Sequence, residues 1–169
     1  MSIPVGGFTF DLGGCFQLIQ EIGISEGAFA AELGVAWRNR AHWIGFLGRY
    51  SSAKGDTFSA FLPINTITQG HILRPKLSGI AIFNLEYTVR LHPILSFSFI
   101  PAYYINTASQ GYNIFGNQER LLGAEFYGSL AWVPLSDVMI NLSGGIFMPS
   151  APETKNLWQA GLGLILSLR

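Results

Sequence analysis

Along most of this chain apolar residues alternate with small or polar ones, and this pattern limits the structures that the chain can adopt. Successive side chains of a β-strand point to opposite faces, so the alternation predicts strands that separate an apolar environment from a more polar one. The last segment shows the pattern best. Even positions from Trp158 to Leu168 are apolar, whereas most odd positions from Gln159 onward are small or polar.

The alternation recurs in eight segments, and each is expected to form a strand. Their lengths bracket the roughly 9 to 11 residues with which a tilted strand crosses a lipid bilayer. The pattern is weakest in residues 43–50, where both faces are fairly apolar. The segments are Phe8–Leu18, Phe29–Arg38, Trp43–Tyr50, Leu77–Leu91, Leu95–Ile105, Gly123–Trp132, Val138–Met148 and Trp158–Leu168.

The composition also points to a membrane. Charged residues make up 12% of the chain and hydrophobic residues 49%, whereas about 25% of the residues in a soluble domain are charged. No apolar run reaches the roughly 20 residues of a transmembrane helix, so strands are the expected membrane-crossing elements. Ten basic and ten acidic residues give a net charge of zero, which argues against nucleic acid as a partner.

The connections between the expected strands alternate in length. Residues 39–41, 92–94 and 134–137 form short connections, whereas residues 51–75, 106–119 and 150–156 form longer ones. Outer-membrane barrels show this asymmetry, and in lipid an open sheet edge would leave backbone groups unpaired. We therefore predict an all-β, antiparallel up-and-down transmembrane β-barrel of about eight strands that occupies residues 1–169 as a single domain.

Two other architectures are compatible with the alternation. The chain could be the C-terminal part of a larger barrel, whose lumen would hold water. It could also be a soluble barrel with its apolar residues inside and its polar residues outside. The low charge content disfavours the soluble barrel, because an exterior in water should be rich in charged residues.

The end of the chain carries a sequence motif as well as a pattern. Gln159, Gly161, Leu164, Leu166 and Leu168 follow one another as a polar residue, a glycine and alternating large apolar residues. This order resembles the C-terminal assembly signal of bacterial outer-membrane β-barrel proteins, although that family usually ends in an aromatic residue. The stretch Leu121–Val138 is also loosely similar to uncharacterised spirochaete-type outer-membrane proteins. The resemblance implies a location in the bacterial outer membrane, with its lipid and its assembly machinery as partners.

The polar face of the expected strands carries most of the ionisable side chains within them. In a narrow barrel the interior is filled by side chains, so these groups are expected to pair as a polar core. In a wider barrel they would line a wet lumen and tune ion selectivity. The predicted lumen-facing residues are Asp11, Glu32, Arg38, Glu86, Arg90 and Glu125, together with Arg49 as a further candidate.

The longest connection, residues 51–75, is unusually apolar for an exposed loop. It contains Phe58, Phe61, Leu62, Ile64 and Ile67. Four explanations remain open at this point. The segment folds inward as a plug, it extends the flanking strands beyond the membrane, it binds a partner at the cell surface, or it is disordered.

The residue types that carry catalysis do not form a recognisable pattern. His71 shares the long loop with Ser51, Ser52 and Asp56, but a solvated loop histidine explains it better than a hydrolase site. No two histidines have the spacing of a zinc motif. Cys15 follows Leu12, Gly13 and Gly14 in an order that resembles a lipoprotein acylation site, yet an ordinary strand cysteine is expected. We expect no enzyme activity, catalytic residue, metal or cofactor.

The expected function follows from this architecture. A structural or porin-like passive-transport role in the outer membrane is the first expectation, and a surface-binding or adhesion barrel that acts through its long external loops is the alternative. The sequence identifies neither a transported solute nor a surface ligand.

Overall fold

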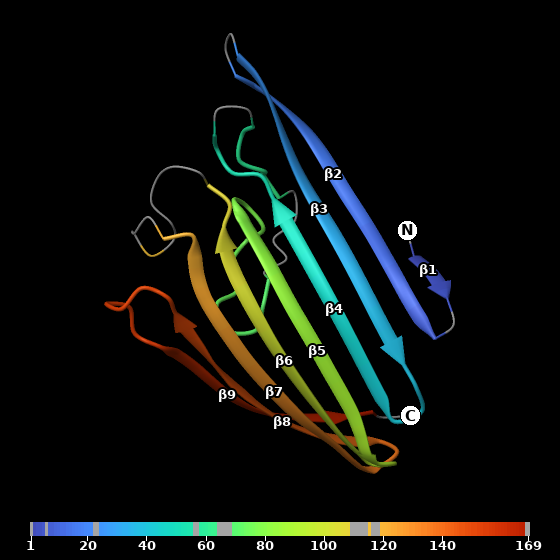
Figure 1. The fold of residues 1–169 in the computed structure, drawn as a ribbon. Coiled ribbons are helices and arrows are strands. Elements are labelled where there is room, and N and C mark those ends of the chain that lie inside the picture. Colours follow the sequence, from blue (N-terminus) through green and yellow to red (C-terminus); the bar gives the residue numbers. More distant parts are fainter. Residues whose placement is uncertain are drawn as a thin grey trace.

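A computed structural model describes residues 2–5, 7–21, 24–55, 58–63, 69–108, 115 and 119–167 of this protein. The regular secondary structure of these residues consists of β-strands. The strands form one sheet, in which they are arranged in the order in which they occur in the chain. Figure 1 shows this sheet as a twisted, curved surface. The strands are β1 (Ser2–Val5), β2 (Phe8–Glu21), β3 (Ile24–Arg38), β4 (His42–Ser51), β5 (Ile80–His92), β6 (Leu95–Asn106), β7 (Leu121–Leu135), β8 (Val138–Pro149) and β9 (Leu157–Leu166).

The antiparallel up-and-down order that the sequence predicts is confirmed. Each strand pairs with the next one in antiparallel fashion from β1 to β9, and β2 to β9 correspond to the eight expected segments. No pair of described residues joins β9 to β1 or β2, so the sheet has two open edges. Among the described residues, no helix is long and apolar enough to cross a membrane.

Several strand boundaries differ from the sequence prediction. β2 and β3 pair with each other as far as Glu21 and Ile24, because cross-strand pairing continues where the apolar alternation becomes weak. β5 begins at Ile80, three residues later than predicted, since Leu77 belongs to the loop and packs against the core. The sequence also did not predict β1, which pairs with Phe8–Asp11 through a turn at Gly7 (φ 88°).

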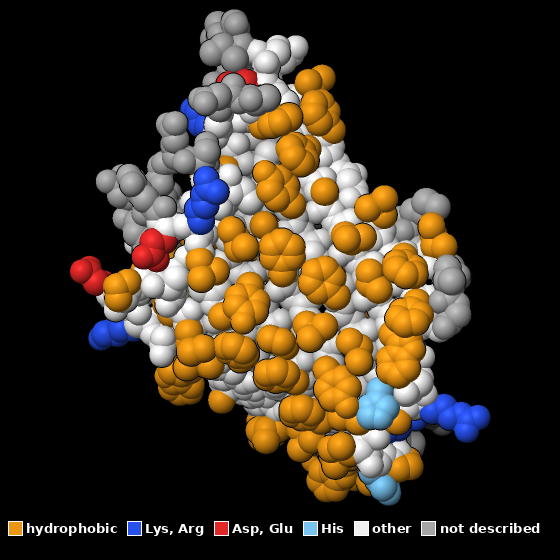
Figure 2. All heavy atoms as spheres, viewed as in Figure 1, with side chains coloured by type: hydrophobic (Ala, Val, Ile, Leu, Met, Phe, Trp, Pro, Cys, Tyr) orange, Lys and Arg blue, Asp and Glu red, His pale blue; other side chains and the backbone are white. Residues whose placement is uncertain are grey.

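The register joins the apolar positions of neighbouring strands into one continuous outer face. For example, Leu95 lies opposite Trp132, Trp132 opposite Ile140, and Ile140 opposite Leu164. Figure 2 shows a face on which hydrophobic side chains cover most of the strands and charged side chains lie toward the margins. Strongly exposed apolar side chains of this outer face include Leu12 (64%), Phe16 (61%), Leu18 (74%), Trp158 (79%), Leu162 (78%) and Leu164 (63%).

The opposite, inner face carries a small core at the end where the long loops lie. Tyr104 and Phe147 are fully buried there, and their rings meet edge to face at 5.8 Å. Loop residues Ile72, Leu73 and Leu77 pack against this core. The segment that connects β4 and β5 therefore folds inward and covers part of the inner face.

Close packing between the loop and the sheet requires a glycine in β8. A Cβ atom at Gly145 would meet the backbone carbonyl oxygen of Phe126, the Cα atom of Tyr127 at 2.9 Å and the side chain of Ile72 at 3.1 Å. Backbone atoms of a central strand cannot move away without disturbing the pairing of the sheet. The position is therefore sterically restricted to glycine.

We expect Gly145→Ala to lower the free energy of unfolding by about 1–3 kcal/mol, the range for overpacking of a packed site. Urea unfolding in detergent micelles, followed by circular dichroism, measures this change. Gly13→Ala is the control, because the nearest atom to its added Cβ is the Glu32 Cβ at 3.7 Å, an ordinary contact. Equal urea midpoints for the two variants would contradict the close approach of the β7 backbone and Ile72 to Gly145.

Candidate functional site

Glu125 is the centre of the contact between the loop and the inner face. It lies on β7 and is 1% exposed. Its carboxylate accepts hydrogen bonds from the backbone N–H groups of His71 (2.8 Å), Ile72 (3.1 Å) and Leu73 (3.1 Å). The Tyr104 hydroxyl donates a fourth hydrogen bond at 3.1 Å. A buried carboxylate needs such donors to offset the loss of its hydration, so Glu125 holds the loop in place.

The local sequence of the loop allows its backbone to approach the carboxylate. Gly70 has a φ of 81°, a conformation that glycine adopts without steric cost, and a side chain at this position would collide with the Tyr104 hydroxyl. The Arg74 Nε donates to the carbonyl oxygen of His71 at 2.8 Å and closes the turn. The His71 ring stacks on Tyr127 with centroids 4.0 Å apart.

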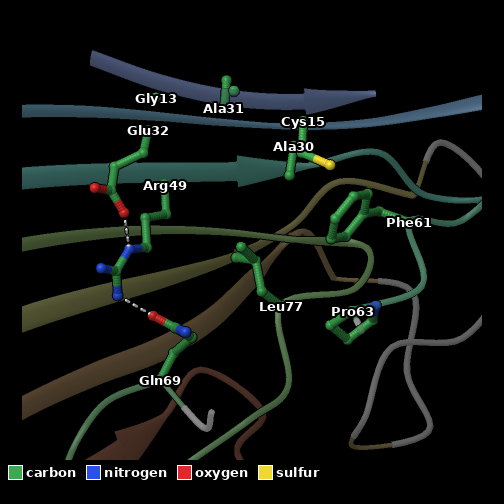
Figure 3. Close-up of a pocket in the computed structure, with 11 residues that line it drawn as sticks. Gly13, Cys15, Ala30, Ala31, Glu32, Arg49, Phe61, Pro63, Gln69 and Leu77 are labelled. Atoms are coloured by element: carbon green, nitrogen blue, oxygen red, sulfur yellow. Dashed lines mark hydrogen bonds and ion pairs between the residues drawn. The ribbon is translucent and has the colours of Figure 1, made fainter. Parts of the chain in front are cut away.

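A second contact attaches the loop to β3 and β4. Arg49 on β4 donates through Nε to the carboxylate of Glu32 at 2.5 Å and through Nη1 to the side-chain oxygen of Gln69. Gln69 is buried, whereas Arg49 and Glu32 are about a third exposed. An ion pair with this exposure adds little stability by itself, so its main effect is to orient the Arg49 guanidinium toward Gln69. Figure 3 shows the three side chains in a row.

A cavity of about 440 Å³ lies between the loop and the inner face of β2 to β4. Glu32, Arg49 and Gln69 form its polar wall, and Cys15, Phe61 and Leu77 are among its other lining residues (Figure 3). A smaller cavity of about 190 Å³ contains Arg49 and Gln69 together with Tyr104 and Glu125. Because both cavities share Arg49 and Gln69, the hydrogen bond between these side chains lies at the boundary between them.

Other described parts of the loop are also fixed to the sheet. The Gln17 side chain donates to the carbonyl oxygen of Leu62 at 2.7 Å and accepts from its N–H at 3.0 Å. Phe61 is buried, whereas Leu62 is 58% exposed. Of the explanations that the sequence left open for this segment, the described residues agree with inward folding. Ile64, Ile67 and Asp56 lie outside the described residues.

The six predicted lumen-facing residues all occupy inner-face positions, but the structure distributes them among separate places. Glu32 meets Arg49, and Glu125 meets the loop backbone. Glu86 accepts from the Thr88 hydroxyl at 3.5 Å. Asp11 lies opposite Gly34, and Arg38 and Arg90 lie at the end of the sheet where the short turns are, in a cavity that no residue of the loop between β4 and β5 lines.

The predicted assembly signal lies on the edge strand β9. Gln159 and Gly161 take inner-face positions opposite Gly145 and Ser143. Leu164 and Leu166 belong to the outer face and are 63% and 60% exposed. Leu168 lies outside the described residues.

Sequence reasoning missed Tyr104 and Gln69 as partners of the charged residues. Tyr104 takes an inner-face position on β6 but is not ionised at neutral pH, and Gln69 lies in a loop with no periodic pattern. A buried carboxylate within a strand implies donors elsewhere in the chain, but it does not tell which residues supply them. Gly70 beside Gln69 was a local sequence signal of a turn, and the structure gives it a φ of 81°.

Comparison with known proteins leaves the function open. No protein-family model matches the sequence, and a search of curated proteins found no significant similarity. Among the described residues, no group of three or more His, Cys, Asp or Glu side chains is arranged to hold a metal ion. The function of this protein is therefore inferred from the two faces of the sheet and from the loop.

We expect Glu125→Gln to release the segment from Gln69 to Gly79, because an amide offers one acceptor oxygen to the four donors that now share a carboxylate. Trypsin cleavage after the exposed Lys76 should become at least several-fold faster in the variant than in the unmodified protein. Gel electrophoresis of timed digests measures the rate.

Glu86→Gln is the matched control for this experiment. It makes the same chemical change on the same inner face, where Glu86 contacts the Thr88 hydroxyl and not the loop backbone. If both variants are cleaved at the unmodified rate, Glu125 does not hold the loop.

Proposed function

We propose that this protein is an integral outer-membrane β-barrel with a structural role, whose interior is closed by a loop at the end where the long connections lie. The observation that carries the proposal is the unbroken apolar outer face. Among the described residues, no Asp, Glu, Lys or Arg occupies an outer-face position of β2 to β9. An apolar surface that extends across eight strands is a liability in water but matches the hydrocarbon region of a membrane.

The open edges of the sheet need partners in such an environment. In lipid, unpaired backbone N–H and C=O groups each cost several kcal/mol. β1 pairs with Phe8–Asp11 only, so the edge of β2 from Leu12 to Glu21 remains available. β2 and β9 run in opposite directions, because each strand between them reverses the chain. Antiparallel pairing of β9 with this part of β2 would close an eight-stranded barrel.

The inner face favours a closed barrel over an open porin. In a barrel of eight strands the interior is filled by side chains. Here Glu125 and Arg49 additionally hold the loop against the inner face through backbone and side-chain hydrogen bonds. A second candidate role is the binding of a small molecule in the cavity of about 440 Å³ between the loop and β2 to β4, which has the size of a small-molecule site.

Folding into lipid vesicles tests the membrane proposal. The unmodified protein should give a band whose gel mobility differs between unheated and boiled samples, as a closed barrel does. Leu164→Arg places a charge on the outer face and should weaken folding by about 2–4 kcal/mol if the residue lies near the middle of the bilayer. The inner-face variant Gln159→Arg, on the same strand, should have a smaller effect.

Planar-bilayer recordings on the same folded protein distinguish a barrel closed by its loop from an open porin. A barrel closed by its loop gives no steady single-channel current, whereas an open porin does.

A Leu164→Arg protein that folds in buffer without lipid or detergent would contradict the membrane location.

The free thiol of Cys15 provides a test of closure between β2 and β9. Cys15 is exposed and takes an inner-face position on β2, so its partner in a closed barrel belongs to the inner face of β9. Among Gln159→Cys, Gly161→Cys and Gly163→Cys, at least one variant should form an intramolecular disulfide on mild oxidation, because directly opposed strand residues have the Cα separation that a disulfide requires. Mass spectrometry of digests identifies the bond.

The outer-face variants Ala160→Cys and Leu162→Cys are the matched controls, since their thiols point away from Cys15 and should remain free. Disulfide-linked dimers from the inner-face set would show that β9 pairs with a second chain. An absence of cross-linking in the whole inner-face set would contradict closure of this chain upon itself.

A further inference from the structure

A separate cavity of about 240 Å³ lies at the end of the sheet where the short turns are. It is formed by the end of β3, the turn into β4, and the adjacent ends of β5 and β6, so its construction does not depend on closure of the barrel. Most of its side chains are basic, aromatic or hydroxylated. The residues that matter here are Arg38, Arg40, Trp43, Thr88, Arg90 and Ser96.

Three guanidinium groups line this cavity without a carboxylate among its lining residues. Arg38, Arg40 and Arg90 make no side-chain hydrogen bond or ion pair to a described residue. The nearest inner-face carboxylate along β5 is Glu86, which contacts the Thr88 hydroxyl at 3.5 Å. Like charges that share a cavity repel each other, so this arrangement favours an anion between them.

The backbone around the arginines is held by hydrogen bonds. The Asn39 side-chain oxygen accepts from the N–H groups of Ala41 (2.9 Å) and His42 (2.7 Å). The Arg90 N–H donates to the carbonyl oxygen of Ala41 at 2.7 Å and thereby joins β5 to the turn. The fold already orders the backbone that carries Arg40 and Arg90. An anion that binds there therefore loses no free energy to ordering this backbone, which favours binding.

The wall of the cavity continues into a row of hydroxyl side chains. Trp43 lies opposite both Arg38 and Thr88 in the register, and its ring occupies the space over Gly45. From Thr88 the row runs through Ser98 to Ser129, and the Thr88 and Ser98 hydroxyls are 2.7 Å apart. This part of the inner face offers neutral donors, and the carboxylate of Glu86 lies behind Thr88, outside the lining of the cavity.

We propose that this cavity binds a phosphate group. Guanidinium forks match the oxygen atoms of phosphate in bidentate fashion, and the tetrahedral arrangement of those oxygen atoms lets guanidinium groups approach from more than one side. The group belongs either to a soluble phosphorylated solute that reaches the inner face from the short-turn end or to the headgroup of an anionic lipid at the membrane rim. Both have the same recognition chemistry.

Inorganic phosphate is the probe in the first arm of the experiment, which tests whether the cavity binds a soluble phosphorylated solute. The protein is folded in zwitterionic detergent, its heat-dependent gel mobility is checked, and phosphate is titrated by calorimetry against a chloride solution of equal ionic strength. Saturable binding is expected, and Arg38→Gln and Arg90→Gln should each weaken it at least ten-fold. Arg120→Gln is the control, because it removes the same charge from an exposed position at the opposite, long-loop end of the sheet.

Vesicles form the lipid arm of the experiment. If a lipid phosphate occupies the cavity, phosphatidylglycerol in phosphatidylcholine vesicles raises the urea midpoint of the unmodified protein, and Arg38→Gln and Arg90→Gln abolish that rise while Arg120→Gln retains it. A response in either arm supports the site and identifies its source. No response in both arms, or an equal loss in Arg120→Gln, overturns it. The gel assay reports barrel formation separately, so failure of the site is distinguishable from failure of the proposed function.

Discussion

The structure depends on the register of its antiparallel backbone pairing. A slip of one residue between two strands would turn every side chain of one strand to the opposite face. From β2 to β9 the pairing keeps apolar positions beside apolar positions, as in the row of Phe10, Val35 and Phe46. The three register shifts lie near strand ends, between Arg90 and His92, between Tyr104 and Ile105, and between Trp132 and Leu135. The central part of the sheet therefore keeps two chemically distinct faces.

The separation of the faces forces the charged residues of the strands into positions where each needs a partner. Glu125 shows the consequence most clearly, because its carboxylate is almost fully buried on the inner face. Its donors come from a loop and from the neighbouring strand β6. If the loop moved away, the Glu125 carboxylate would lose three of its four hydrogen-bond donors, which is unfavourable for a buried charge. The same contact that stabilises Glu125 thereby keeps the loop over part of the inner face at the long-loop end.

The two ends of the inner face consequently differ in chemistry. At the long-loop end, Glu125 and the pair of Glu32 and Arg49 are engaged by the loop. At the short-turn end, Arg38 and Arg90 lie beside hydroxyl side chains in a cavity that the loop does not line. This division fits the proposed closed barrel, in which ligands would meet the inner face from the short-turn end. It also explains why a single polar core, as the sequence suggested, does not describe the arrangement of these residues.

The sequence by itself determined the strands, their up-and-down order and the face to which most side chains belong, because the period of two is a local property of each segment. Tertiary structure decided the partners of the charged residues. The three N–H donors to Glu125 lie 52 to 54 residues away from it in the chain, a distance over which no local pattern carries information. It also decided the position of Leu122, which alternation would place outside with Ala124 but which the irregular pairing at Tyr104 and Ile105 turns into the core. Alternation fixes which way a side chain points only while the pairing is regular, whereas contacts between distant segments and local bulges arise only when the whole sheet has formed.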